Sequence, residues 1–328
     1  MSNFLILRNE IINISMQKIL LPLFLLLLNI YANGQSIISY ENLINRQELT
    51  DVVEYLSDDL TQGRASGTYG KQSAEQYIVG RFKEYGLKPY NWNYTQSFSY
   101  NDSIALRNVV GIIPSVEKSD EFVIIGAHYD HLGELAGRIY HGADDNASGV
   151  AALLSIAKSF AKMKAEGVGP KKNLMFVAYD GKELSLAGSH FFTENLSIPT
   201  KKVFCAINID MLGTTLAPIH KGRNDYLIVL GESSLPLSLQ GEIGNINLNH
   251  RFGMDIDYSF YGSKDFTQMM YENGDHYSFA QKGIPSLLFT SAFHNYTYKP
   301  SDTIDIIDFE ILRKRTAFLF DVINKFSK

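Results

Sequence analysis

The 328-residue chain is poor in several features that would point to particular protein classes. It has one cysteine, Cys205, so an internal disulfide framework is excluded. Charged residues make up 20% of the chain and the net charge is −5, so it lacks the basic excess typical of proteins that bind nucleic acid. Hydrophobic residues, in contrast, reach 45% and include 20 phenylalanines, which is enough for a sizeable core.

Long apolar runs are also scarce, and the clearest one lies near the start. Residues 19–28 read ILLPLFLLLL and follow Lys18. This run is shorter than the ~20 residues of a membrane span but is typical of a signal segment, and small residues follow it. We therefore predict a signal segment over residues 1–34, with Met16 as the preferred start, and a protein that is exported to the periplasm or secreted. A buried core segment is the alternative. No cysteine lies directly after the run, so a lipid anchor there is excluded.

Residues 35–328 read as one domain of alternating strands and helices. Apolar spacing of three and four residues predicts helices that begin near residues 71, 150 and 309. Short continuous apolar runs predict buried strands at 122–125, 173–179, 203–209, 226–230 and 285–290. Strands separated by helices indicate an α/β fold in which a mostly parallel sheet is covered on both faces, a three-layer sandwich. Ligands of such sheets bind beyond the carboxyl ends of the strands.

Polar side chains follow the predicted strands at those ends. An imidazole and several carboxylates stand directly after a strand or before a helix: His128, Asp130, Asp144, Asp145, Asp180, Glu183 and Asp210. Carboxylates that meet at one sheet edge repel one another unless a cation lies between them. Imidazole with carboxylates is a hydrolytic zinc ligand set. Asp130, two residues after His128, is close enough to orient the imidazole from behind.

These residues stand within motifs that resemble one known family, the di-zinc aminopeptidases related to bacterial leucyl aminopeptidase. The resemblance covers essentially the whole chain after the signal segment. It rests most strongly on GAHYDHLG and GADDNASG, and also on LSDDLTQGRASGTYG, NVVGIIPS, FVAYDG, NIDMLG, GDHYSFAQKGIPSLLF and YKPSDT. The resemblance implies a zinc exopeptidase fold, a two-metal hydrolysis, and peptides or protein N-termini as substrates.

The resemblance also implies roles for individual residues. His128 and Asp210 match ligands of one zinc, Glu183 matches a ligand of the other, and Asp144 matches the carboxylate that bridges both. Asp130 matches the carboxylate behind the histidine. Tyr271 is a weak match to a tyrosine that polarises the scissile carbonyl.

Two positions depart from the family pattern. Lys182 stands where the family has a general-base glutamate, and Tyr298 stands where it has a zinc-ligand histidine. Both losses fall on the Glu183 half of the site. The Lys182 ammonium could replace part of the missing metal charge, or the side chain could turn outward to solvent. His294 and His141 are candidate substitute ligands, although a surface or loop histidine is the commoner role for each.

Two function classes therefore remain open. The first is an exported zinc aminopeptidase with impaired activity, which holds one zinc and for which a second is undecided. The second is an inactive member of the family that binds peptides or proteins. Related folds also act as single-zinc glutaminyl cyclases, but that chemistry uses a carboxylate where Lys182 stands. Since the two departures belong to one half of the site, the sequence suggests that both must be reverted to restore activity.

Overall fold

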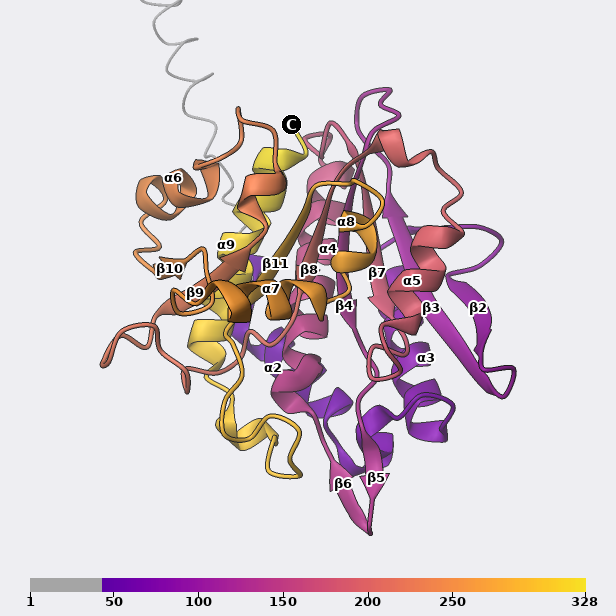
Figure 1. Ribbon diagram of the computed structural model, residues 1–328. Helices are drawn as coiled ribbons and strands as arrows, with labels where there is room; N and C mark the ends of the chain where they lie inside the picture. Colours follow the sequence, from indigo (N-terminus) through magenta and orange to yellow (C-terminus); the bar gives the residue numbers. More distant parts are fainter. Residues whose placement is uncertain (1–42) are drawn as a thin grey trace, which may run out of the picture. The chain divides into compact units, whose positions relative to one another are not determined.

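The structure, a computed structural model, describes residues 43–328, so the predicted signal segment lies outside the described residues. Within them the main sheet has nine strands (Figure 1). The order is β1-β3-β7-β4-β8-β11-β9-β10, and β2 pairs with β3. The strands are β1 (Lys88–Pro89), β2 (Thr95–Tyr100), β3 (Ile104–Ile113), β4 (Phe122–His128), β7 (Asn173–Tyr179), β8 (Val203–Ile209), β9 (Tyr226–Leu230), β10 (Asp255–Asp257) and β11 (Ser286–Thr290), and β5 (Gly133–Leu135) with β6 (Arg138–Tyr140) forms a separate hairpin.

The four central strands run parallel to one another. β4 pairs in parallel with β7 and β8, and β11 pairs in parallel with β8. Antiparallel pairing begins on both sides of this group, where β3 joins β7 and β9 joins β11. The sheet is therefore mixed. Its parallel centre brings the carboxyl ends of β4, β7, β8 and β11 to one edge, as expected for a ligand site of this fold class.

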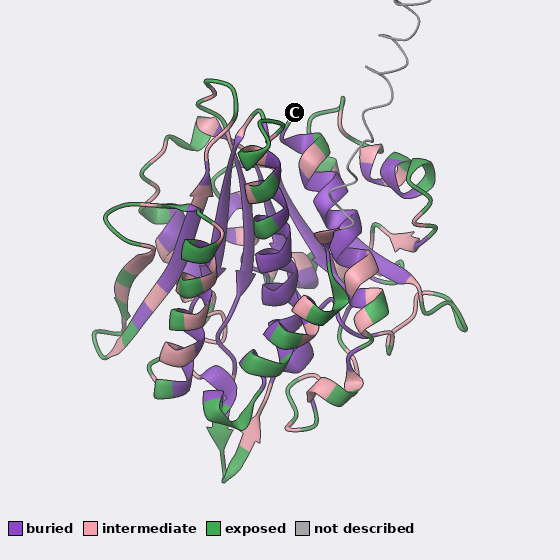
Figure 2. Cartoon of the chain, turned by 180° about the vertical axis from the view of Figure 1, so that it is seen from behind, coloured by how far each residue is buried: buried purple, intermediate pink, exposed green. Residues whose placement is uncertain are grey.

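Helices cover both faces of the sheet, which confirms the predicted three-layer α/β fold (Figures 1 and 2). They are α2 (Arg46–Leu56), α3 (Tyr69–Glu84), α4 (Gly149–Ala165), α5 (Ala187–Glu194), α6 (Glu242–Asn249), α7 (Lys264–Glu272), α8 (Tyr277–Ala280) and α9 (Phe309–Phe326). Alternation along β4 shows the two layers. Val123 and Ile125 join the core formed with α2, α3, α4 and α9, whereas Ile124 packs with Phe192 of α5 and Phe279 of α8. No helix within residues 43–328 is long and apolar enough to span a membrane.

A buried arginine ties the end of β4 to the acidic loop before α4. Arg64 is fully buried and donates hydrogen bonds to the carbonyls of Tyr129 at 2.9 Å and Gly142 at 2.9 Å. It also donates to the backbone carbonyl of His141 at 2.7 Å and to that of Leu56. Burial lowers the pKa of Arg64 to about 10, so the guanidinium remains charged at neutral pH. These bonds satisfy loop carbonyls that would otherwise be buried without a donor, and they set the loop beside the strand end.

Candidate metal centre

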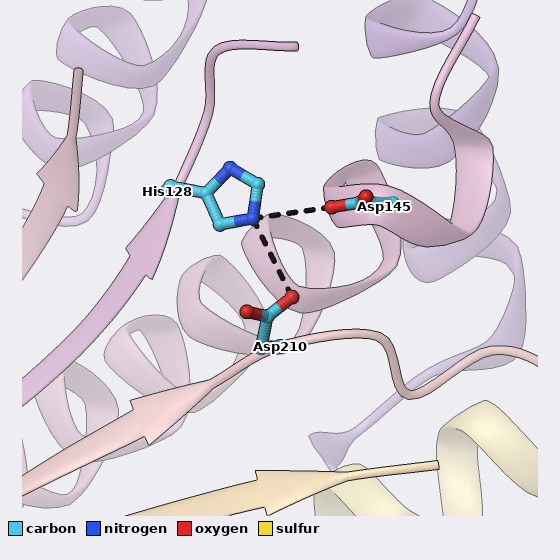
Figure 3. Close-up of side chains that lie close together, drawn as sticks. All are labelled: His128, Asp145 and Asp210. Atoms are coloured by element: carbon cyan, nitrogen blue, oxygen red, sulfur yellow. Dashed lines mark ion pairs between the residues drawn. The ribbon is translucent and has the colours of Figure 1, made fainter. Parts of the chain in front are cut away.

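Three buried side chains converge at the carboxyl edge of the central strands (Figure 3). His128 is the last residue of β4, Asp210 follows β8, and Asp145 lies in the turn before α4. The Nε2 atom of His128 lies 3.2 Å from Asp145 Oδ1 and 3.4 Å from Asp210 Oδ1. One ligand atom from each residue therefore lies within 4.8 Å of the others, a spacing that one metal ion can bridge.

The three facing groups suit a divalent cation. His128 Nε2, Asp210 Oδ1 and both carboxylate oxygens of Asp145 are buried and have no partner with hydrogen-bond geometry among residues 43–328. Buried polar atoms are almost always paired, and carboxylates gathered without a cation repel one another. An imidazole with two carboxylates is a donor set for zinc. These residues therefore fit a metal ion held between them.

Asp130 supports this centre on the Nδ1 side of His128, and its backbone and side chain have separate roles. The Nδ1 atom of His128 lies 3.1 Å from the backbone carbonyl of Asp130 and 3.7 Å from its carboxylate. The carboxylate accepts hydrogen bonds from the backbone amides of Lys182 and Glu183, each at 3.1 Å. Asp130 thus orients the imidazole through its carbonyl and fixes the turn after β7 through its side chain.

The charges at the centre shift the pKa values of its members. Burial and the ammonium of Lys182 lower the pKa of His128, but Asp210, Asp130 and Asp145 outweigh them and raise it well above 6.5. Burial raises the pKa of Asp145, but Lys182 and His128 reverse this and hold the carboxyl well below its usual range. These opposite shifts favour a protonated imidazole at His128 beside an ionised Asp145.

The position of Asp144 differs from the sequence prediction. The prediction placed Asp144 with His128 and Asp210, but the structure brings Asp145 to them instead. The Asp144 carboxylate accepts hydrogen bonds from Ser148 Oγ at 2.9 Å and from the Gly213 amide at 2.6 Å. It also lies 3.1 Å from Nε2 of His294. Asp144 is thus used to hold neighbouring loops together.

The local backbone explains why adjacent aspartates point in different directions. Asp145 has φ −102° and ψ 88° inside the turn Ala143–Ser148, outside helical geometry. Asp302 anchors this turn, since its carboxylate accepts hydrogen bonds from the amides of Asp144 at 2.8 Å and Asp145 at 3.1 Å. The two side chains consequently leave the turn on different sides, and only that of Asp145 faces His128.

Lys182 points into the centre, which decides between the two orientations that the sequence left open. Its side chain is 8% exposed, and Nζ lies 3.0 Å from Glu183 Oε1 and 3.7 Å from Asp145 Oδ1. Nζ also donates to the hydroxyl of Tyr298 at 3.3 Å. Burial lowers the pKa of Lys182, but Asp145, Asp210 and Glu183 outweigh it and raise the pKa well above 10.5. The side chain is therefore a fixed cation.

Neither histidine considered as a substitute ligand joins the centre. His294 faces Asp144, and His141 lies 2.9 Å from Asp59 Oδ1. A different histidine, His131, forms a second group with Asp145 and Glu183, in which one ligand atom from each lies within 4.8 Å of the others. Sequence reasoning missed His131, although its place three residues after His128 in GAHYDHLG was a signal.

The second group differs from the first in its electrostatics. Burial lowers the pKa of His131 to about 3, so its imidazole is neutral. Burial raises the pKa of Glu183 to about 7 against the opposing effect of Lys182. Glu183, predicted as a zinc ligand, therefore lies with His131 and Asp145 in this group, and the cation that it contacts in the structure is the ammonium of Lys182.

A cavity of about 350 Å³ opens beside these side chains. Its apolar lining residues are Leu186, Met211, Met269, Met270, Leu288 and Phe293, and its polar ones are Lys182, Glu183, Ser185, Asp210, Asn273, Thr290 and Tyr298. Tyr271 is not among the lining residues. Its hydroxyl donates to the backbone carbonyl of Ser286 at 3.0 Å, and its side chain lines a separate cavity. The structure thus gives no support to the role suggested for Tyr271.

Comparisons with known proteins agree with this fold and identify a family. The model of Peptidase family M28 matches residues 108–323, more than half of the chain. The probable leucine aminopeptidase 1 of Trichophyton verrucosum is 26% identical over 310 residues, which cover 89% of this chain and 78% of that protein. LapB from Legionella pneumophila has a TM-score of 0.70 at 18% identity and covers 90% of this chain and 75% of its own. BSAP, a zinc aminopeptidase from Bacillus subtilis, has a TM-score of 0.66 at 14% identity, and the match covers 86% of this chain and 95% of the BSAP chain. The two structural likenesses show the fold, and the family match shows that this chain belongs to peptidase family M28.

Proposed function

We propose that this protein is an exported, zinc-dependent aminopeptidase of low activity, which binds the amino-terminal end of peptides and carries one zinc in its resting form. The observation that carries the proposal is the position of Lys182. Its buried ammonium contacts Glu183 at 3.0 Å and lies 3.7 Å from Asp145. A cation therefore stands where the family resemblance expects both a general base and a second metal.

The single metal would be held by His128, Asp145 and Asp210. Zinc bound there would supply Lewis-acid activation of water and of the scissile carbonyl. The three carboxylates of Asp145, Glu183 and Asp210 are then balanced by one divalent ion together with the ammonium of Lys182. A second divalent ion would leave this cluster with an excess of positive charge, so the charge balance supports one ion.

The cavity supports a substrate with an apolar first side chain. Its apolar lining consists of methionine, leucine and phenylalanine, and Glu183 and Asp210 of the two metal-ligand groups line the same cavity. A peptide whose first side chain enters the apolar part would present its first amide near His128 and Asp210. Burial of that side chain would fix the orientation of the amide.

The same geometry predicts slow turnover. Lys182 stays protonated because Asp145, Asp210 and Glu183 raise its pKa despite burial, and a protonated amine accepts no proton from water. Its positive charge also opposes the approach of the ammonium of an aminopeptidase substrate. General-base catalysis is typically worth ~10²–10⁴ in rate, and this contribution is missing at position 182.

A binding module without turnover is the second candidate, favoured by the combination of an open cavity and a missing base. Zinc analysis beside an aminoacyl-anilide assay separates the two. We expect about one zinc per chain and slow hydrolysis that a chelator abolishes. One zinc with no turnover, but with binding of a peptide, would favour the binding module. Two zincs with fast turnover in the unaltered protein would contradict the proposal.

We also expect the stabilising effect of zinc to increase with pH. Acidic neighbours raise the folded-state pKa of His128 above 6.5, despite burial and Lys182. Without metal, the protonated His128 stabilises the folded state. This contribution is complete at pH values below ~6.5, the unfolded-state pKa of the imidazole, and it is lost as the pH rises through the folded-state pKa. Zinc requires the neutral imidazole, so protons compete with it least at high pH.

The zinc-induced rise in Tm should accordingly be larger at pH 8 than at pH 6 in thermal unfolding experiments. His128→Gln should remove this dependence. His220→Gln provides the matched control. His220 is exposed, its Nδ1 atom pairs with the carboxylate of Asp255, and it belongs to neither metal-ligand group. An equal rise in Tm at both pH values in the unaltered protein would show that no proton is displaced by the metal.

Export is the remaining part of the proposal. It is supported by the apolar run at residues 19–28 and the small residues after it. We expect export to remove residues 1–34 and to leave residues 35–328 as one domain in the periplasm or medium. Intact-mass analysis of the exported protein checks this, and a mass that includes residues 16–34 would refute it.

A further inference from the structure

A second metal-ligand group lies beside the first and shares Asp145 with it. Its other members are His131 and Glu183, and one ligand atom from each of the three lies within 4.8 Å of the others. His131 and Asp145 are buried, and the Glu183 side chain is 17% exposed. This group differs from the pattern implied by the family resemblance, in which the imidazole comes from position 298.

The His131 side chain has no other evident role within the part of the chain that the structure describes. Both of its ring nitrogens are buried there without a hydrogen-bond partner. Its Nδ1 atom lies 3.9 Å from Asp145 Oδ2, and its ring stacks near that of Tyr298, with centroids 6.4 Å apart. A buried imidazole whose two nitrogens are both unpaired is unusual. Its place beside two carboxylates is the arrangement that a zinc ligand has.

Lys182 lies among the same carboxylates. Its Nζ atom lies 3.0 Å from Glu183 Oε1 and 3.7 Å from Asp145 Oδ1, and it is 5.4 Å from the centre of the Tyr298 ring. The ammonium thus contacts or approaches both acidic members of the second group. Because Nζ lies within 3.7 Å of one oxygen of each carboxylate, a metal ion bound between the same two oxygens would meet a like charge at close range.

We propose that the ammonium of Lys182 and a second divalent ion compete for one position, and that His131, Asp145 and Glu183 bind this ion when the ammonium is removed. The proposal deepens the proposed function, because it concerns the same site and takes the single zinc at His128 as its starting point. It does not depend on hydrolysis. Lys182 would then act as a built-in cation that keeps the site at one metal.

Metal counting in matched variants tests the proposal. Lys182→Met removes the ammonium but keeps most of the side-chain volume, and we expect bound zinc to rise from one to two per chain. Lys182→Met with His131→Phe should return to one, because phenylalanine keeps a ring beside Tyr298 but offers no nitrogen. Lys182→Arg and Tyr298→Phe are controls that keep the cation, and both should stay at one. Zinc is counted by elemental analysis after saturation and removal of free metal.

A spectroscopic measurement accompanies the count. Cobalt(II) titration of the Lys182→Met protein should show a second binding step in the visible absorption, and this step should be absent when His131 is also replaced. Thermal unfolding confirms that each variant is folded. If His131→Phe fails to fold, His131→Gln replaces it, because glutamine is a poor zinc ligand of similar size.

The change in metal count between proteins decides the outcome. An equal count in the unaltered and Lys182→Met proteins would overturn the proposal, as would an undiminished count after His131 is replaced. If the unaltered protein bound no zinc, the proposed function would be contradicted. A zinc ion that is gained in the Lys182→Met protein, and lost again when His131 is replaced, would still support competition between the ammonium and a metal ion. The two failures are therefore distinguishable.

Discussion

Lys182→Glu is expected to raise the kcat/KM for aminoacyl-anilide hydrolysis by ~10²–10⁴, the range typical of general-base catalysis. The change removes a cation that Asp145 and Glu183 hold at the site. It also supplies a carboxylate able to accept a proton from the attacking water. The opened position beside His131 can then take a second ion, whose charge offsets the added carboxylate.

Lys182→Met is the matched control for this prediction. It removes the ammonium without adding a base. Its kcat/KM for the anilide should therefore remain at least tenfold below that of Lys182→Glu, whatever its metal content. Equal rates in the two variants would mean that removal of the cation, rather than the return of a base, accounts for the gain. No gain in Lys182→Glu would contradict the assignment of position 182 as the place of the base.

Adding Tyr298→His to Lys182→Glu tests which imidazole completes the second metal group. The sequence alone suggested that both reversions are required. The structure changes this expectation, because His131 already lies beside Asp145 and Glu183. We therefore expect less than a tenfold further gain from the second change. A large gain that appears only in the double variant would favour the original two-change expectation and would count against His131 as a ligand.

Asp145→Asn is expected to weaken zinc binding more than any other single change in the turn Ala143–Ser148. Asp145 is the carboxylate shared by the groups around His128 and His131. Its loss should lower zinc affinity by more than the ~10–100-fold typical for a residue that only supports a ligand. Competition with a chromogenic chelator measures this affinity.

Asp144→Asn is the neighbouring control. The Asp144 carboxylate accepts hydrogen bonds from Ser148 and Gly213 and does not reach the metal group. We expect zinc affinity to fall by less than tenfold, whereas the free energy of unfolding falls by ~1–3 kcal/mol because a buried hydrogen-bonding group is disturbed. If Asp144→Asn abolished zinc binding and Asp145→Asn did not, the metal ligand would be Asp144, as the sequence suggested, and the assignment of Asp145 would be wrong.

The sequence by itself determined the fold class and the edge at which the chemistry lies. Continuous apolar runs at 173–179, 203–209 and 226–230 became β7, β8 and β9 with the same bounds. Such runs are informative because a strand buried on both faces needs an apolar side chain at nearly every position. Since β4, β7 and β8 are parallel, the polar residues after them had to meet at one edge.

Tertiary structure alone decided which side chains meet at that edge. Asp144 and Asp145 are adjacent and chemically identical, and only the turn anchored by Asp302, 158 residues after Asp144, directs Asp145 towards His128. The sequence offered His141 and His294 as substitute ligands, whereas in the structure it is His131 that lies in one group with Glu183. Local patterns fix which face of an element is apolar, whereas the direction of a loop side chain depends on hydrogen bonds from distant segments. For the same reason the sequence left the orientation of Lys182 open. Asp145 and Tyr298, which come from two distant loops, act with the neighbouring Glu183 to turn its ammonium inward.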